Sequence, residues 1–238
     1  MNDVINRNWP IEIKKLRNLP LAGEPFICLF SGGKDCGMAL SMAMQSGNAV
    51  ALIHYIDEDN VSSFHLQKRE VIEAQSASLN IPVVYLYDNW WNKWNKLVKI
   101  FMEYEKQGVK YVVFGDLTEN SNVKHQVTLC QSANIRPCLP LLSLPYEFLI
   151  DEIGKRNIKS VISTISHSLI ENKWLGKVFD REVYGYFLKL GLDPFGESGE
   201  FHTTLVDADC FKYPLNYKIT ESNGEKIIIK IKKKTNDT

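Results

Sequence analysis

One short segment combines the residue types that bind phosphate groups: residues 31–36, Ser-Gly-Gly-Lys-Asp-Cys. It directly follows the apolar stretch Phe26–Phe30, which predicts a strand, and directly precedes Cys36–Ser46, whose small residues predict a helix. A chain that passes from a parallel strand into a helix points several backbone N–H groups at one spot, where the helix dipole adds positive potential. The position therefore predicts a polyphosphate site.

The residue types within this segment agree with that chemistry. Gly32 and Gly33 allow close approach of a ligand, while Ser31 and Lys34 offer a hydroxyl donor and a positive charge. We expect Lys34 to hold the departing phosphates. Asp35 would repel an anion unless a metal ion or a local hydrogen bond engages it, and its presence favours Mg²⁺ nearby.

The spacing fits neither a Walker A loop nor a G-x-G-x-x-G loop. It resembles the SGGxDS signature of PP-loop ATP pyrophosphatases, which implies cleavage of ATP between its α and β phosphates. Cys36 stands at the last position, where the signature has serine. A thiol is a weaker donor than a hydroxyl, so we expect one weaker phosphate contact. An ordinary glycine-rich turn between strand and helix is the alternative.

A second informative segment lies near the C-terminus, at residues 196–203, Gly-Glu-Ser-Gly-Glu-Phe-His-Thr. Its carboxylates, Glu197 and Glu200, could take up a proton or bind an ammonium ion. Carboxylates would not help to bind triphosphate, so we expect them on the acceptor side of the cleft. An exposed acidic turn is the alternative interpretation.

Together these segments resemble the diphthine-ammonia ligase family, the PP-loop enzymes that form the last amide of diphthamide on elongation factor 2. Further matching pieces are Ser63-Phe64-His65, Phe114-Gly115-Asp116-Leu117 and Trp174-Leu175-Gly176-Lys177, in the family's order. The resemblance implies an acyl-adenylate attacked by ammonia, with AMP and pyrophosphate as products. Its partners would be ATP, ammonia or an ammonia donor, and a carboxylate substrate such as diphthine.

The expected site divides by role. Lys34, Glu197 and Glu200 are the candidate catalytic residues, and Asp35 and Asp116 the candidate ligands of Mg²⁺. His65 could instead make a local hydrogen bond, and Asp116 could instead cap a helix. Nucleotide contacts are expected from Ser31, Gly32, Gly33, Lys34, Asp35, Cys36, His65, Gly115 and Asp116.

These residues need a scaffold, and the chain's alternation of apolar strand-length stretches with amphipathic segments predicts an α/β fold. We expect a doubly wound parallel sheet of the Rossmann-like HUP type over 1–140, and a smaller α+β substrate-facing half over 141–238. Predicted strands are Ala49–Tyr55, Val83–Tyr87, Tyr111–Phe114, Pro137–Leu142, Ile158–Ile165, a β-rich piece near Leu205 and Lys226–Lys232; predicted helices are His65–Leu79, Asn122–Ala133, Tyr146–Arg156 and Leu175–Leu190.

Composition restricts the function classes. The formal net charge is zero, so no overall field favours nucleic acid, and no apolar stretch has the length of a membrane span. The five cysteines form no C-x-x-C pair, so we expect reduced thiols. We expect a cytoplasmic protein, and a homodimer is possible. Trp90, Trp91 and Trp94 could stack on RNA, but core packing of a helix is the favoured interpretation.

Two other functions stay open at this point. The adenylate could be passed to another small metabolite or to an RNA base, or the chain could sense adenine nucleotides without catalysis.

Overall fold

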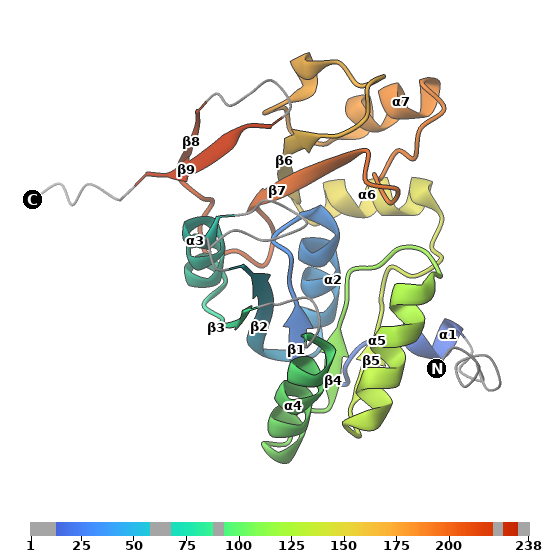
Figure 1. The fold of residues 1–238 in the computed structure, drawn as a ribbon, viewed down its shortest axis with the longest axis vertical. Helices are drawn as coiled ribbons and strands as arrows, with labels where there is room; N and C mark the ends of the chain where they lie inside the picture. Colours follow the sequence, from blue (N-terminus) through green and yellow to red (C-terminus); the bar gives the residue numbers. More distant parts are fainter. Residues whose placement is uncertain (1–12, 58–67, 88–92, 221–225, 233–238) are drawn as a thin grey trace, which may run out of the picture.

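The computed structural model describes residues 13–57, 68–87, 93–220 and 226–232. Its larger sheet has five parallel strands in the order β3-β2-β1-β4-β5 (Figure 1). Parallel neighbours need long crossover connections, which helices supply here. The predicted doubly wound parallel sheet is therefore confirmed. The strands are β1 (Pro25–Leu29), β2 (Asn48–Ile56), β3 (Val83–Tyr87), β4 (Tyr111–Val113) and β5 (Arg136–Cys138).

Helices cover both faces of this sheet. Successive side chains of a strand point to opposite faces, so Phe26 and Cys28 join one buried apolar cluster and Ile27 joins another. Burial on both sides explains why β1 is apolar at every position. The first cluster contains side chains of α2 (Lys34–Met44) and α3 (Arg69–Leu79), and the second those of α1 (Ile13–Leu16), α4 (Lys93–Lys106) and α5 (Ser121–Ser132).

The interpretation of the tryptophan segment as core packing of a helix, here α4, is confirmed in its described part. Leu97 and Phe101 are fully buried, and Trp94 packs against their cluster with its ring centroid 4.2 Å from that of His125. Trp94 is thus a packing residue. Trp90 and Trp91 lie outside the described residues.

The C-terminal part adds two small antiparallel sheets, β6 with β7 and β8 with β9. None of the described helices has the length and apolar character needed to cross a membrane. All five cysteines are free thiols, as expected. The elements are α6 (Tyr146–Lys155), β6 (Lys159–Ile165), the 3-10 helix η1 (Asn172–Trp174), α7 (Arg181–Lys189), β7 (Phe201–Asp207), β8 (Tyr217–Thr220) and β9 (Ile228–Ile231).

The helix predicted over Leu175–Leu190 is wrong in its first part. The Gly176 N–H donates to the carbonyl of Ile162 at 2.8 Å, so this segment lies along β6 instead of coiling. Asp180 then caps α7, because its carboxylate accepts the N–H groups of Glu182 and Val183 in the first helical turn.

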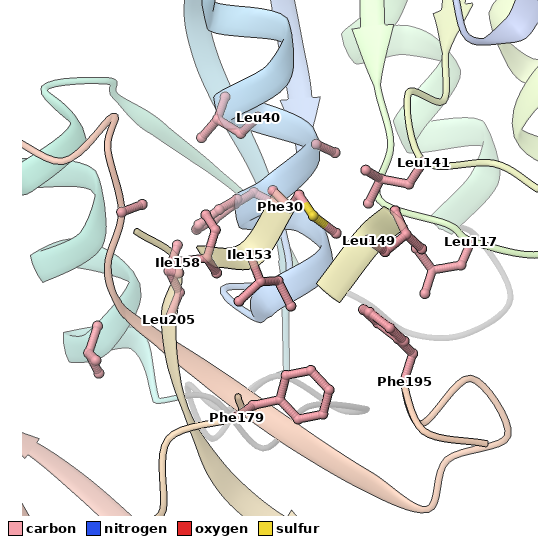
Figure 2. Close-up of a cluster of buried hydrophobic side chains, with 14 of the residues drawn as sticks. Phe30, Leu40, Leu117, Leu141, Leu149, Ile153, Ile158, Phe179, Phe195 and Leu205 are labelled. Carbon is pink, nitrogen blue, oxygen red and sulfur yellow. The ribbon is translucent and has the colours of Figure 1, made fainter. Parts of the chain in front are cut away.

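The C-terminal part shares the core of the first sheet face. β7 lies across α2, and a Cβ atom at Gly37 of α2 would be only 2.6 Å from Cδ2 of Leu205. Figure 2 shows Leu205 and Phe195 from the C-terminal part in one cluster with Phe30 and Leu40. Folding of the two parts is therefore coupled by shared apolar burial.

A buried polar network also joins the two parts. Arg156, at the end of α6, donates from Nε to Oε2 of Glu152 at 2.9 Å and from Nη1 to Oγ of Ser41 on α2 at 3.1 Å. The Ser41 hydroxyl in turn donates to Asp209 beyond β7, at 2.6 Å. The network fixes α2, α6 and the end of β7 relative to one another.

Candidate functional site

The order of the strands has a switch point at the carboxyl ends of β1 and β4, and this region is called the crevice below. From β1 the chain proceeds to β2 and β3 on one side of the sheet, and later to β4 and β5 on the other. The connections after β1 and β4 therefore diverge, which is where open α/β sheets bind ligands. Residues 31–36, hereafter the PP-loop, follow β1 directly, and Gly115 and Asp116 follow β4.

The two connections touch at Gly115. A Cβ atom added there would lie 2.7 Å from the backbone nitrogen of Cys36 and 2.9 Å from the carbonyl carbon of Asp35. Only glycine allows this approach without displacing the first turn of α2. The structure thus brings together two expected nucleotide-binding segments that lie about eighty residues apart in the printed sequence.

The PP-loop turns sharply at Gly32, whose φ of +84° is a conformation that favours glycine. The N–H of Gly33 lies 3.4 Å from Oγ of Ser31, and this hydroxyl donates to Sγ of Cys36 at 3.2 Å. Burial raises the pKa of the Cys36 thiol to about 11, so the group is neutral at physiological pH. Ser31 and Cys36 are therefore one hydrogen-bonded pair at the start of α2.

Strand β7 braces the PP-loop from the C-terminal part. The backbone N–H of Leu205 donates to the carbonyl of Gly32 at 2.8 Å, and that of Lys34 donates to Oγ1 of Thr203 at 3.1 Å. Gln75 of α3, fully buried, donates its amide N–H groups to the carbonyls of Gly32 at 3.0 Å and Leu205 at 2.7 Å. Sequence reasoning included Thr203 in the second segment without assigning it this contact, and it missed Gln75, because nothing local to either residue signals a partner so distant along the chain.

Asp35 and Asp116 occupy the crevice in different ways. Asp35 accepts from Nζ of Lys34 at 2.8 Å through Oδ2, while its Oδ1 is buried without a hydrogen-bond partner. Asp116 accepts from the side-chain amides of Asn122 at 3.2 Å and Gln126 at 3.1 Å. Asp116 does not cap α5, since Asn120 does. Burial raises the pKa of both carboxyl groups.

Asp35 and Asp116 fit a magnesium ion only if a nucleotide supplies further oxygen ligands. The described part of the chain holds no group of three or more His, Cys, Asp or Glu side chains arranged around a metal position. Mg²⁺, however, commonly takes one or two carboxylates and completes its shell with water and phosphate oxygens. The unsatisfied Oδ1 of Asp35 suits such use.

Glu197 reaches this crevice from the acidic loop, residues 193–200. Its Oε2 accepts from the hydroxyl of Thr118, beyond β4, at 3.1 Å. Burial, and then the negative charge of Asp35, raise the pKa of Glu197 from 4.5 to about 7, with Asp116 adding in the same sense. The carboxyl is thus partly protonated at neutral pH, as suits a group that exchanges protons.

The other expected site residues lie as follows. Glu200 is buried, and its carboxylate accepts the N–H of Ser198 at 3.1 Å, so it shapes the acidic loop. The ammonium of Lys34 is also buried and donates to the carbonyl of Phe195 at 2.6 Å. His65 lies outside the described residues.

Comparison with known families identifies both parts of the chain. Residues 25–137 match the diphthamide synthase N-terminal domain, and residues 146–236 match the diphthamide synthase C-terminal domain. A search of curated proteins gives no match. The first match contains the PP-loop and Asp116, and the second contains the acidic loop and β7. The two matches follow in the family's order and take in the whole crevice, so this chain belongs to the diphthamide synthase family, whose members are ATP-utilising enzymes of diphthamide synthesis.

Proposed function

We propose that this protein is an ATP-dependent amide ligase, with diphthine on elongation factor 2 as the carboxylate substrate. The carboxylate oxygen bonds to the α phosphorus of ATP, the bond to the bridging β oxygen breaks, and pyrophosphate leaves. Ammonia then attacks the acyl carbon, a proton leaves the nitrogen, and AMP departs. Carboxylate, ATP and ammonia thus become amide, AMP and pyrophosphate.

The observation that supports this proposal best is the position of Glu197. The side chain belongs to the C-terminal part, yet it bonds to Thr118 beyond β4 and is coupled to the charges of Asp35 and Asp116. A phosphate site alone gains nothing from a third acid, because like charges repel. A group that binds ammonium and removes a proton from the amine accounts for it.

In this proposal the nucleotide-binding residues act by placement and charge. The hydroxyl of Ser31, the backbone at Gly32 and Gly33, and the N–H groups of the first turn of α2 beyond Lys34 would receive the β and γ phosphates. Asp35, with Asp116 behind it, would hold Mg²⁺, which would offset the phosphate charge. Residues 1–140 would then be the nucleotide-binding half and 141–238 the substrate-facing half, with β7 crossing between them.

The test follows the products and the amide separately. The protein is incubated with MgATP, ammonium and elongation factor 2 that carries diphthine, and AMP, ADP and pyrophosphate are measured alongside the mass change from carboxyl to amide. We expect AMP and pyrophosphate in equal amounts with the amide. Formation of ADP would overturn the mechanism, and pyrophosphate release without amide would show that another acceptor is used.

Glu197→Gln is the matching variant, since it keeps the size of the side chain and removes its proton exchange. We expect unchanged MgATP affinity by calorimetry and amide formation lowered by about a hundredfold, the lower range for a positioned acid or base. Loss of MgATP affinity alone would assign Glu197 to the nucleotide.

A further inference from the structure

Lys34 directs its side chain away from solvent into the C-terminal part. The side chain is 4% exposed, and Nζ lies 5.3–5.4 Å from the ring centroids of Phe179, Phe195 and Phe201. Each distance is within the range of a cation–π contact. Figure 2 shows Phe179 and Phe195 at the end of the buried cluster opposite Leu40. The ammonium is therefore enclosed by three aromatic rings from beyond residue 178.

The hydrogen bonds of this ammonium run to its neighbour Asp35 at 2.8 Å and to the carbonyl of Phe195 at 2.6 Å. An ammonium has three N–H donors, so these bonds use two of them. A charge-assisted bond to a buried carbonyl is strong, and a carbonyl deprived of its donor would bear a desolvation cost. The Lys34 side chain thus links the start of α2 to the C-terminal part through the carbonyl of Phe195.

Phe195 lies two residues before Glu197, and the peptide around it is held on both sides. Its N–H donates to Oδ1 of Asp193 at 2.8 Å, and the other oxygen of Asp193 accepts from the Tyr146 hydroxyl at 2.8 Å. Its carbonyl is held by Lys34. The anchored peptide determines where the chain enters the turn that carries Glu197.

We propose that Lys34 is a positioning residue, whose ammonium holds the acidic loop against the PP-loop and thereby places Glu197 beside Thr118. The catalytic consequence rests on the function proposed above. The structural consequence does not, because the anchoring of the loop can be measured without substrate.

The first experiment measures amide hydrogen exchange by mass spectrometry in peptides that cover residues 193–200. Lys34→Met keeps the apolar stem inside the aromatic enclosure and removes the donors. We expect exchange in these peptides to rise about tenfold or more, with peptides of β4 and β5 unchanged. Lys155→Met is the matched control, since Lys155 also forms an ion pair and contacts one ring but is 64% exposed. Unchanged exchange in Lys34→Met would overturn the proposal.

The second experiment restores the missing group chemically. Lys34→Ala leaves space for an alkylammonium in the enclosure, and n-propylammonium replaces the lost atoms. We expect n-propylammonium to restore protection of residues 193–200, and 1-propanol, a neutral analogue, to have no such effect. Equal effects of both compounds, or of neither, would contradict a role for the ammonium. If Lys34→Met does not fold, Lys34→Gln, which offers two neutral N–H donors in place of the three of an ammonium, should give intermediate exchange.

The third experiment tests whether Lys34 acts through Glu197. In a double-mutant cycle, Lys34→Met should lower kcat for amide formation about tenfold in the wild-type background and less than about twofold beside Glu197→Gln. Equal losses in both backgrounds would assign Lys34 to the phosphates instead. If wild-type protein makes no amide, the proposed function fails, whereas the exchange experiments still decide the anchoring role.

Discussion

Glu197→Gln should stabilise the folded protein at pH 8, although it removes a proposed catalytic group. The carboxyl of Glu197 has a pKa of about 7 in the folded protein, against an ordinary value of 4.5, because burial and the charge of Asp35 disfavour its ionised form. At about 1.4 kcal/mol for each pH unit, ionised Glu197 lowers the free energy of unfolding by up to about 3 kcal/mol. Glutamine has the size of the protonated form and carries no charge.

The sign and the pH window follow from the direction of the shift. Between pH 4.5 and about 7 the unfolded chain has lost the Glu197 proton while the folded protein still holds it. The unfolded state then binds fewer protons, so this group's contribution to stability falls as pH rises through the window and levels off above it. The advantage of the Glu197→Gln variant should therefore be near zero at pH 4.5 and largest above pH 7.

The measurement is urea unfolding of wild type and variant, with EDTA and without nucleotide, at several values between pH 5 and pH 8. Glu147→Gln is a suitable control, because Arg181 lowers the pKa of this exposed glutamate. Its replacement should destabilise at neutral pH, the opposite sign. A constant difference between wild type and Glu197→Gln across the range would refute the buried, charge-coupled position of Glu197.

Three further changes test other parts of the site. Gly115→Ala should weaken MgATP binding about tenfold to a hundredfold by calorimetry, since its Cβ would lie 2.7 Å from the backbone of Cys36; unchanged affinity would show that the two connections move freely apart. Cys36→Ser restores the stronger donor of the family signature and should tighten MgATP binding by about threefold to tenfold, a result that equal or weaker binding would contradict. Arg156→Met should lower the free energy of unfolding by about 2 kcal/mol or more, because it leaves Glu152 short of a buried partner; chemical denaturation with an unchanged transition would place this network outside the stabilising core.

The parts of the site that sequence could predict are those encoded locally. A strand, two glycines and a helix N-terminus adjoin in the chain, so the PP-loop and its place at the sheet edge followed from the residues around Gly32. Gly115 and Asp116 follow another strand of the same parallel sheet, so topology brought them to the same edge. Glu197 was predicted as a site residue because polar and acidic side chains are concentrated in residues 196–203.

The sequence could not predict the features of the site that depend on contacts between residues far apart in the chain. The partner of the Lys34 backbone, Thr203, is 169 residues away, and the partner of its ammonium, Phe195, is 161 residues away. Lysine in a phosphate-binding motif suggests a phosphate contact, and only the fold reveals the aromatic enclosure. The start of α7 was missed for a similar reason, because pairing with β6 outweighed the helical periodicity before Asp180.

The bond from Leu205 to the carbonyl of Gly32 also bears on synthesis of the chain. A ribosome releases residues in order, so the PP-loop emerges long before the strand that braces it. Until β7 arrives, the Gly32 carbonyl can accept only from Gln75 and the backbone N–H of Lys34 lacks Thr203, so the PP-loop of a nascent chain is incompletely braced. Because such non-local contacts also form late in folding, the capacity to bind ATP should mature together with the C-terminal part. A strand that is made late is thus the one that completes the bracing of the PP-loop.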